Sequence, residues 1–255
     1  MNKHDQNDAS YQNWHWDVIV AGALLTRLPL PHAPQSAFER QANSVWAFPI
    51  IGLVVALLSC LAGFVAFGLG LSAPITAGLM LGVNMILTGA MHEDGLADCA
   101  DGFWGGFDPE RRLEIMKDSQ IGTYGVLALV VTIGLRWLAL SAIISTGFAG
   151  VIAAAVLSRG ILPALMAMLN QARDIGLSHR VGRPAHFSAM IAFGIASVIT
   201  LIMIGFSAIG AIIATVVVAF AVGRLAKAKI NGQTGDVLGA TQVLSETAVL
   251  LWLIA

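Results

Sequence analysis

The chain has 255 residues, of which 57% are hydrophobic and 11% are charged, and its formal net charge is −1. Soluble domains are about 25% charged, so this composition, with a mean hydropathy of +0.79, excludes an ordinary soluble domain and indicates a membrane protein. The near-neutral charge argues against a nucleic-acid-binding protein, which would need a basic face. Two cysteines cannot build a disulfide framework.

The N-terminal segment, residues 1–44, begins with a polar tail of 17 residues that we expect to be solvated or interfacial. It does not resemble a cleavable signal peptide, because only a short apolar stretch follows before Arg27. The prolines after Arg27 stop that stretch short of the roughly 20 residues that cross a bilayer. We therefore expect residues 18–31 to be an interfacial or re-entrant segment.

The rest of the chain alternates long apolar segments with polar ones, which predicts an all-α, polytopic membrane helical bundle in a single domain over residues 1–255. About seven transmembrane helices are expected, within a range of six to eight. The predicted spans are residues 45–71, 74–91, 124–146, 151–169, 187–204, 209–222 and the short tail 243–255. In the second of these, Gly78 and Gly82 form a face that would let a neighbouring helix approach closely, although glycine is frequent in such helices.

Charge is distributed unevenly between the connections. The turns near residues 72–74, 147–150 and 205–208 carry no charge. Nearly every Lys and Arg falls in the polar segments 1–44, 92–123, 170–186 and 224–242. By the positive-inside rule, these four segments lie together on the cytoplasmic side, the last three as loops.

The most unusual stretch is residues 91–106, where Glu93, Asp94, Asp98 and Asp101 fall within nine residues. On a helix the three aspartates would lie within about 60° of one another. Stacked carboxylates repel unless a cation sits between them, and Mg²⁺ prefers such oxygen ligands. The stretch predicts a metal site beside the membrane rather than a solvated acidic loop. Its second residue, His92, could ligate a metal, act as a base, or make a local hydrogen bond at a helix end.

Two further polar segments are compatible with phosphate binding. Residues 111–125 combine an amphipathic first half, typical of a surface helix, with a second half in which Asp118 and two glycines precede a helix start. Residues 231–239 form a glycine-rich loop around Asp236 that can hold phosphate or simply turn a corner.

Two arginines, Arg136 and Arg159, fall near the middle of predicted spans, where a charge costs at least about 2.5 kcal/mol. They either form a buried ion pair, for example with Glu246, or line a cavity and bind phosphate. Together with the acids, these charges favour phosphoryl-group chemistry, in which metal ions and basic side chains neutralise phosphate oxygens.

The run HEDGLADCADG at residues 92–102 resembles the signature of the adenosylcobinamide-GDP ribazoletransferases, also called cobalamin synthases. Six further segments resemble that family's blocks in the same order, so that the resemblance covers nearly the whole chain. They are residues 26–29, 48–52, 114–119, 121–125, 158–160 and 232–236. The chain departs from the family pattern at residues 103–106.

The resemblance implies a Mg²⁺-dependent enzyme of the bacterial inner membrane that acts late in vitamin B12 assembly. It would join adenosylcobinamide-GDP to α-ribazole or α-ribazole 5′-phosphate and release GMP. Metal ligands carried over from the family are Asp94, Asp98 and Asp101, completed by Asp118 and Asp236. The catalytic set is Asp94 and Asp98 with Glu93 or His92 assisting proton removal, and the substrate contacts are Arg27, Lys117, Ser119, Arg159, Gln233 and Thr234.

Two rival functions remain at this point. A CDP-alcohol phosphotransferase also uses spaced aspartates, but its motif has Arg where this chain has Asp98, and no second such block occurs. A transporter would bind substrate near the membrane midplane, often within inverted repeats, whereas no repeat is evident here. Lipid is an expected partner and nucleic acid is not, and a homo-oligomer is compatible with the sequence.

Overall fold

The computed structural model describes residues 14–255, and within them it contains helices and no strand. The predicted tail is therefore described only from Trp14 onward. The elements are α1 (Trp14–Leu25), α2 (Gln35–Phe38), α3 (Gln41–Ser44), η1 (Val45–Ala47), α4 (Phe48–Gly68), α5 (Ala73–Thr88), α6 (Met91–Gly105), α7 (Pro109–Ile115), α8 (Thr123–Ile143), η2 (Ile144–Thr146), α9 (Ala149–Gly160), α10 (Leu162–Met168), α11 (Leu177–Val181), α12 (His186–Ile204), α13 (Ser207–Ile230) and α14 (Gly235–Trp252).

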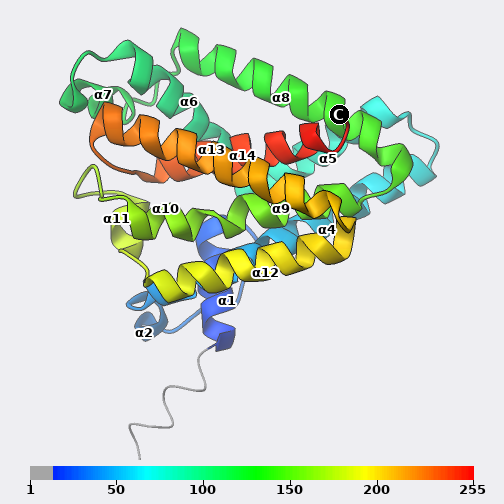
Figure 1. Cartoon of the computed structure of the whole chain (residues 1–255), viewed down its shortest axis with the longest axis horizontal. Coiled ribbons are helices and arrows are strands. Elements are labelled where there is room, and N and C mark those ends of the chain that lie inside the picture. The colour runs from blue at the N-terminus through cyan, green and yellow to red at the C-terminus, as the bar shows by residue number, and fades with distance from the viewer. Residues whose placement is uncertain (1–13) are drawn as a thin grey trace, which may run out of the picture.

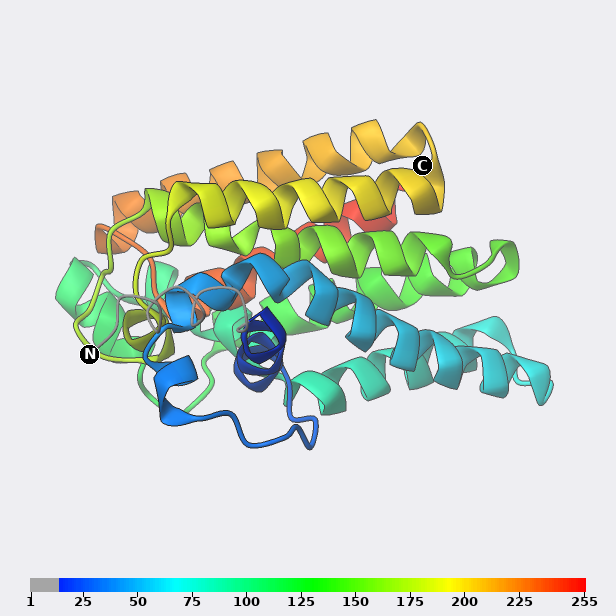
Figure 2. The same ribbon diagram turned by 90° about the horizontal axis from the view of Figure 1, so that it is seen from below.

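The long helices run side by side along the longest axis of the molecule (Figures 1 and 2). Among residues 14–255, five continuous helical stretches are long and apolar enough to cross a membrane: residues 41–68, 123–146, 149–168, 186–204 and 207–230. Their outward faces carry large exposed apolar side chains such as Phe64, Ile202 and Phe220, as lipid-facing surfaces do. The predicted all-α polytopic bundle is confirmed.

The described part of the chain has five candidate spans, or six if the α5–α6 pair counts as one, against about seven expected within a range of six to eight. The difference lies mainly in the predicted last span, residues 243–255, which belongs largely to α14. This helix is apolar because most of it is buried inside the bundle, and it packs on α6, α8, α9 and α13. An apolar sequence does not distinguish a helix surrounded by protein from one surrounded by lipid.

The N-terminal helix α1 lies across the long helices instead of along them: it is upright in Figure 1 and seen end-on in Figure 2. With 12 residues it is too short to span a bilayer, and the interfacial or re-entrant placement of residues 18–31 stays a prediction. It packs against α3 and α4 at the side of the bundle.

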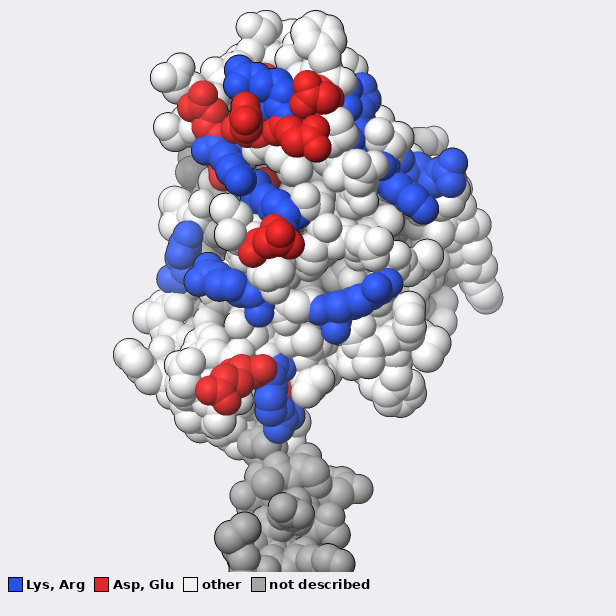
Figure 3. Space-filling model, turned by 90° about the vertical axis from the view of Figure 1, so that its left-hand side faces the viewer, with Lys and Arg blue, Asp and Glu red and all other residues white. Residues whose placement is uncertain are grey.

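Two of the predicted polar loops are mainly helical. Residues 92–123 contain α6 and α7, and α6 is bent by 88° from α5. In residues 224–242, α13 continues to Ile230 and α14 begins at Gly235, so the connection is only four residues long. The loop prediction was wrong there because charged residues on the exposed side of a helix end, such as Lys227 and Lys229, resemble a loop in composition. Charged side chains of both signs are nevertheless spread over the end of the molecule that Figure 3 shows, which is the left-hand end in Figure 1.

Close helix contact occurs at Gly52 of α4 and not at the pair predicted from the sequence. A Cβ atom at Gly52 would lie 2.6 Å from the Ala155 carbonyl oxygen of α9. A Cβ at Gly82 would meet no heavy atom of residues 14–255 within 4 Å, and one at Gly78 would meet only Trp137 Nε1, at 3.9 Å. The glycines of α5 therefore mark no helix interface in this chain.

The centre of the bundle holds a buried ionic network that joins four helices. Arg136 of α8 donates from Nη1 to Glu93 Oε1 of α6 at 2.7 Å and from Nη2 to Glu246 Oε1 of α14 at 2.6 Å. Arg159 of α9 donates from Nη1 to Glu246 Oε2 at 3.1 Å, and Gln242 Nε2 donates to the same oxygen at 2.6 Å. Of the two alternatives for these arginines, a buried ion pair or a phosphate-binding cavity, the structure shows the ion pair with Glu246. Two arginines and two glutamates balance each other's charge in this network.

We expect Glu246→Gln to destabilise the protein by about 3–5 kcal/mol, because it leaves two buried guanidiniums with one carboxylate. The matched control is Glu114→Gln, which removes an ion pair to Arg111 whose side chains are 61% and 65% exposed, and which should change little. Thermal unfolding in detergent measures both. Equal melting temperatures for the two variants would contradict the importance of the network.

We also expect Gly52→Ala to lower stability by about 1–3 kcal/mol, because the added methyl group meets the α9 backbone. Gly82→Ala, in open space on α5, should leave the melting temperature unchanged or raise it. A loss at Gly82 equal to that at Gly52 would contradict the assignment of the α4–α9 contact.

Candidate functional site

The candidate site lies at the charged end of the bundle, where α6 packs against the start of α14. At Gly95 the two backbones are so close that a Cβ atom would lie 2.7 Å from the Asp236 carbonyl oxygen. Gly239, one turn along α14, faces the backbone of His92, and a Cβ there would lie 3.2 Å from the His92 Cα. Two glycines thus bring the acidic helix beside Asp236, which is 141 positions after Gly95 in the sequence.

The carboxylates of Asp94, Asp98 and Asp236 are close enough to repel one another. Burial, followed by the charges of Asp236 and Asp94, raises the pKa of the Asp98 carboxyl from 3.8 to about 7. Burial also raises the pKa of Asp236, although the nearby Arg173 guanidinium opposes this shift. Such a cluster attracts a positive charge.

Arg173 supplies part of that charge. Its Nη2 donates to Asp236 Oδ2 at 3.0 Å, and the Thr234 hydroxyl donates to the same oxygen at 3.1 Å. The other terminal nitrogen, Nη1, is buried and has no hydrogen-bond partner among residues 14–255. This arginine can therefore bind a further acceptor, such as a phosphate oxygen.

The sequence did not single out Arg173, which is one of several arginines in a polar segment. It reaches the site because residues 170–172 pair with the loop before α14. Gln233 N donates to the Asn170 carbonyl at 2.8 Å, and Ala172 N donates to the Gln233 carbonyl at 2.9 Å. This long-range pairing has no local sequence signal.

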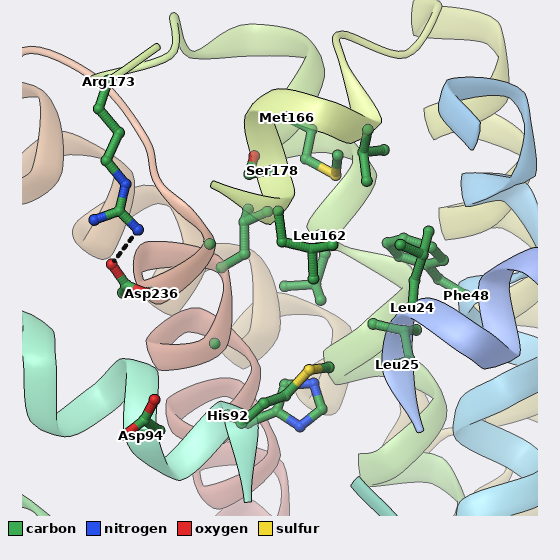
Figure 4. A pocket seen from close by; sticks show the side chains of 16 residues that line it. Leu24, Leu25, Phe48, His92, Asp94, Leu162, Met166, Arg173, Ser178 and Asp236 are labelled. Atoms are coloured by element: carbon green, nitrogen blue, oxygen red, sulfur yellow. Dashed lines mark hydrogen bonds and ion pairs between the residues drawn. The ribbon is translucent and has the colours of Figure 1, made fainter. Parts of the chain in front are cut away.

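A cavity of about 180 Å³ lies beside the acids, between α1, α4, α6, α10, α11 and α14. Its polar wall contains Arg173, Asp236 and Asp94, which Figure 4 shows on one side. The opposite wall is apolar and includes Leu24, Leu25, Phe48, Leu162 and Met166. The pocket therefore offers a charged half and an apolar half to one ligand or to two adjacent ones.

His92 lies between these two walls (Figure 4). It is 3% exposed, and its Nε2 atom has no hydrogen-bond partner in the described part of the chain. A buried imidazole nitrogen without a partner is costly, so this atom is available to a ligand.

Asp101 shares α6 with the other acids but has a different environment. Its Oδ2 accepts from Gly122 N at 2.7 Å and its Oδ1 accepts from Gly125 N at 2.9 Å. The carboxylate thus caps the start of α8, where a negative charge is favourable. The helix predicted for this stretch is continuous through Gly95 and Gly102.

The remaining predicted site residues are dispersed. Lys117, Asp118 and Ser119 are exposed between α7 and α8 and are not among the described residues that line the pocket. Arg27 lines a second hollow beside α1.

Glu93 and Arg159 belong to the central ionic network. Gln233 is buried and accepts from Ser178 at 2.8 Å, and Thr234 caps α14 by accepting from Val237 N. The structure therefore brings together His92, Asp94, Asp98 and Asp236, and adds Arg173.

Within residues 14–255, no group of three or more His, Cys, Asp or Glu side chains is placed to hold a metal ion by itself. The donors nevertheless fit Mg²⁺, which is usually held by one or two carboxylates together with waters and substrate phosphates. The mutual repulsion of Asp94, Asp98 and Asp236 is the feature of this site that a divalent cation would relieve.

Comparison with known proteins shows which family the chain belongs to. The family model described as cobalamin-5-phosphate synthase matches residues 17–254. An adenosylcobinamide-GDP ribazoletransferase from Bradyrhizobium diazoefficiens is 40% identical over 238 residues, which cover 92% of both chains. One from Brucella anthropi is 42% identical over 252 residues, which cover 93% of this chain and 96% of the relative. No solved structure matches.

The match to the family model extends over nearly all described residues, and both relatives are covered almost end to end. The segments that form the pocket, from α1 to α14, all lie inside the matched range. The chain therefore belongs to the cobalamin-5-phosphate synthase family and is a transferase of cobalamin biosynthesis.

Proposed function

We propose that this transferase joins adenosylcobinamide-GDP to α-ribazole or α-ribazole 5′-phosphate at the α6–α14 site. The products are adenosylcobalamin or its 5′-phosphate, together with GMP. The observation that carries the proposal is the meeting of Asp94, Asp236 and Arg173 at one pocket, with Asp98 close enough to Asp94 and Asp236 for their charges to raise its pKa. The names of the relatives supply the two substrates.

In the proposed reaction, the 3′-hydroxyl oxygen of the ribazole attacks the phosphorus attached to the cobinamide arm. A new phosphodiester bond forms, the bond between the two phosphates of the GDP group breaks, and GMP leaves with that electron pair. Arg173, whose Nη1 has no hydrogen-bond partner among residues 14–255, binds the oxygens of the diphosphate. Burial, followed by the Arg159 charge, lowers the pKa of His92 to about 3, so its Nε2 orients the attacking hydroxyl by accepting a hydrogen bond from it. A carboxylate of the acidic cluster, Asp94 or Asp98, takes the proton, because Glu93 is paired with Arg136.

We further propose that Mg²⁺ is the cofactor and that Asp94, Asp98 and Asp236 would hold it. When bound, the ion would neutralise negative charge on the non-bridging phosphate oxygens and on the leaving phosphate. Asp101 has both oxygens engaged by backbone amides, and Asp118 accepts from Gln120 N in an exposed turn, so their roles as ligands stay predictions.

The site is proposed to face the cytoplasm from the bacterial inner membrane. The polar segments that the positive-inside rule assigns to the cytoplasm include α6, α7, α11 and the α13–α14 connection. These elements lie at the charged end shown in Figure 3, and they carry the site.

Asp98→Asn should abolish metal-dependent GMP release while leaving the protein folded in detergent. The amide has nearly the size of the carboxylate but lacks the charge that attracts the cation. Asp174→Asn, which changes an exposed acid of the α10–α11 connection, is the matched control and should retain activity. Undiminished GMP release by the Asp98 variant would refute the assignment.

The raised pKa of Asp98 also predicts how metal-free protein responds to pH. An unfolded Asp has a pKa of about 3.9, whereas folding raises that of Asp98 to about 7. Between these values the folded state holds one more proton, so stability falls as pH rises through this window.

Without Mg²⁺, wild type should therefore melt at a lower temperature near pH 8 than near pH 5, and Asp98→Asn should reduce this difference. Thermal unfolding in chelator-treated detergent solution measures it. The same pH dependence in both proteins would contradict the electrostatic account of the cluster.

A further inference from the structure

We propose that the apolar half of the pocket binds the heteroaromatic base of the acceptor riboside, so that this cavity is the acceptor subsite. This inference rests on the proposed function and names which substrate part enters the pocket. The guanine and the corrin ring of the donor would lie outside it.

The size of the cavity limits what it can hold. About 180 Å³ is below the range of roughly 300–1,000 Å³ that encloses a whole drug-sized ligand. A corrin ring with its side chains is far larger than such a ligand. The pocket therefore receives one ring system of a substrate and leaves the rest at the surface.

The chemistry of the wall selects among ring systems. Side chains of α1, α4 and α10 that line the wall include Leu25, Phe48 and Met166, which offer no strong hydrogen bonds. Guanine carries several donors and acceptors on its edges, and each one buried without a partner costs about 1–3 kcal/mol. The benzimidazole-type base of a ribazole has a single free ring nitrogen, so it loses far less on entering the apolar half.

The position of His92 gives a second, independent argument. Its buried Nε2 atom has no partner in the part of the chain that the structure describes, and it lies between the apolar and the polar walls. A riboside with its base on the apolar wall would place ribose hydroxyls near this junction. The polar wall beyond it, with Asp94, Asp236 and Arg173, would then receive the diphosphate. In this arrangement the ribose hydroxyl of the acceptor lies between its own base, on the apolar wall, and the phosphorus of the donor, on the polar wall, as the transfer requires.

Leu177 offers a direct test, because this apolar side chain lines the pocket from α11 and is 41% exposed, so that a polar residue there should not unfold the protein. We expect Leu177→Asp to raise the KM for α-ribazole by about tenfold or more and to leave the KM for adenosylcobinamide-GDP within about twofold. Ile175→Asp is the matched control and should change neither constant, because Ile175 is 61% exposed and is not among the residues of 14–255 that line the pocket.

Binding without turnover provides a readout that is independent of activity. α-Ribazole alone should raise the melting temperature of wild type and of Ile175→Asp, and this shift should be lost in Leu177→Asp. With wild type, replacing the benzimidazole by an adenine base should lower kcat/KM by about 10-fold or more, because the adenine edge would be left without partners.

A rise in the KM for the donor, with that for the acceptor unchanged, would overturn the inference and assign the pocket to the donor. Equal effects of Leu177→Asp and Ile175→Asp would also overturn it. If Leu177→Asp proves unstable, Leu177→Ser replaces it with the same expectation. Failure of wild type to release GMP at all would instead refute the proposed function, so the two failures are distinguishable.

Discussion

The structure depends most on the ion pairs that Arg136 makes with Glu93 and Glu246. Glu93 is next to Asp94 on α6, and Glu246 lies on α14, the helix that begins with the Asp236 turn. One guanidinium therefore fixes the spacing of the two helices that carry the acidic groups. Charges inside an apolar bundle are costly when unpaired, so the network tolerates few alternative arrangements of α6 against α14.

That spacing brings carboxylates that repel one another together at the end of the bundle. Asp94, Asp98 and Asp236 meet there, burial raises the pKa of Asp98 and Asp236, and Arg173 forms an ion pair with Asp236 alone. A site with excess negative charge and a free guanidinium nitrogen suits a cation and a phosphate that arrive together. The same helices that secure the core thus prepare the proposed metal and diphosphate positions.

The pocket beside the acids has a charged wall and an apolar wall within one cavity. α6 and α14 supply most of its charged groups, whereas α1, α4 and α10 supply leucine, phenylalanine and methionine side chains. A short helix that lies across the bundle is what closes the apolar side, so α1 has a place in the site although it is too short to be a span. Its sequence indicated an interfacial segment and gave no reason to expect a pocket wall.

The sequence by itself determined that the chain is a helical membrane protein, that residues 91–106 form an acidic helix, that charge gathers at one end, and which family the chain resembles. It could do so because the length of an apolar segment, the spacing of acids and a local motif are all properties of contiguous residues. Tertiary structure alone decided that α14 is an interior helix, that Asp101 caps α8, and that the two mid-span arginines pair with Glu93 and Glu246. It also decided that Arg173 joins the site, through a pairing between residues 170–172 and Gln233. These features arise from contacts between segments that are far apart in the sequence. They cannot be predicted from local sequence, because the burial of a side chain and the pairing of its charge depend on which neighbours the fold brings to it.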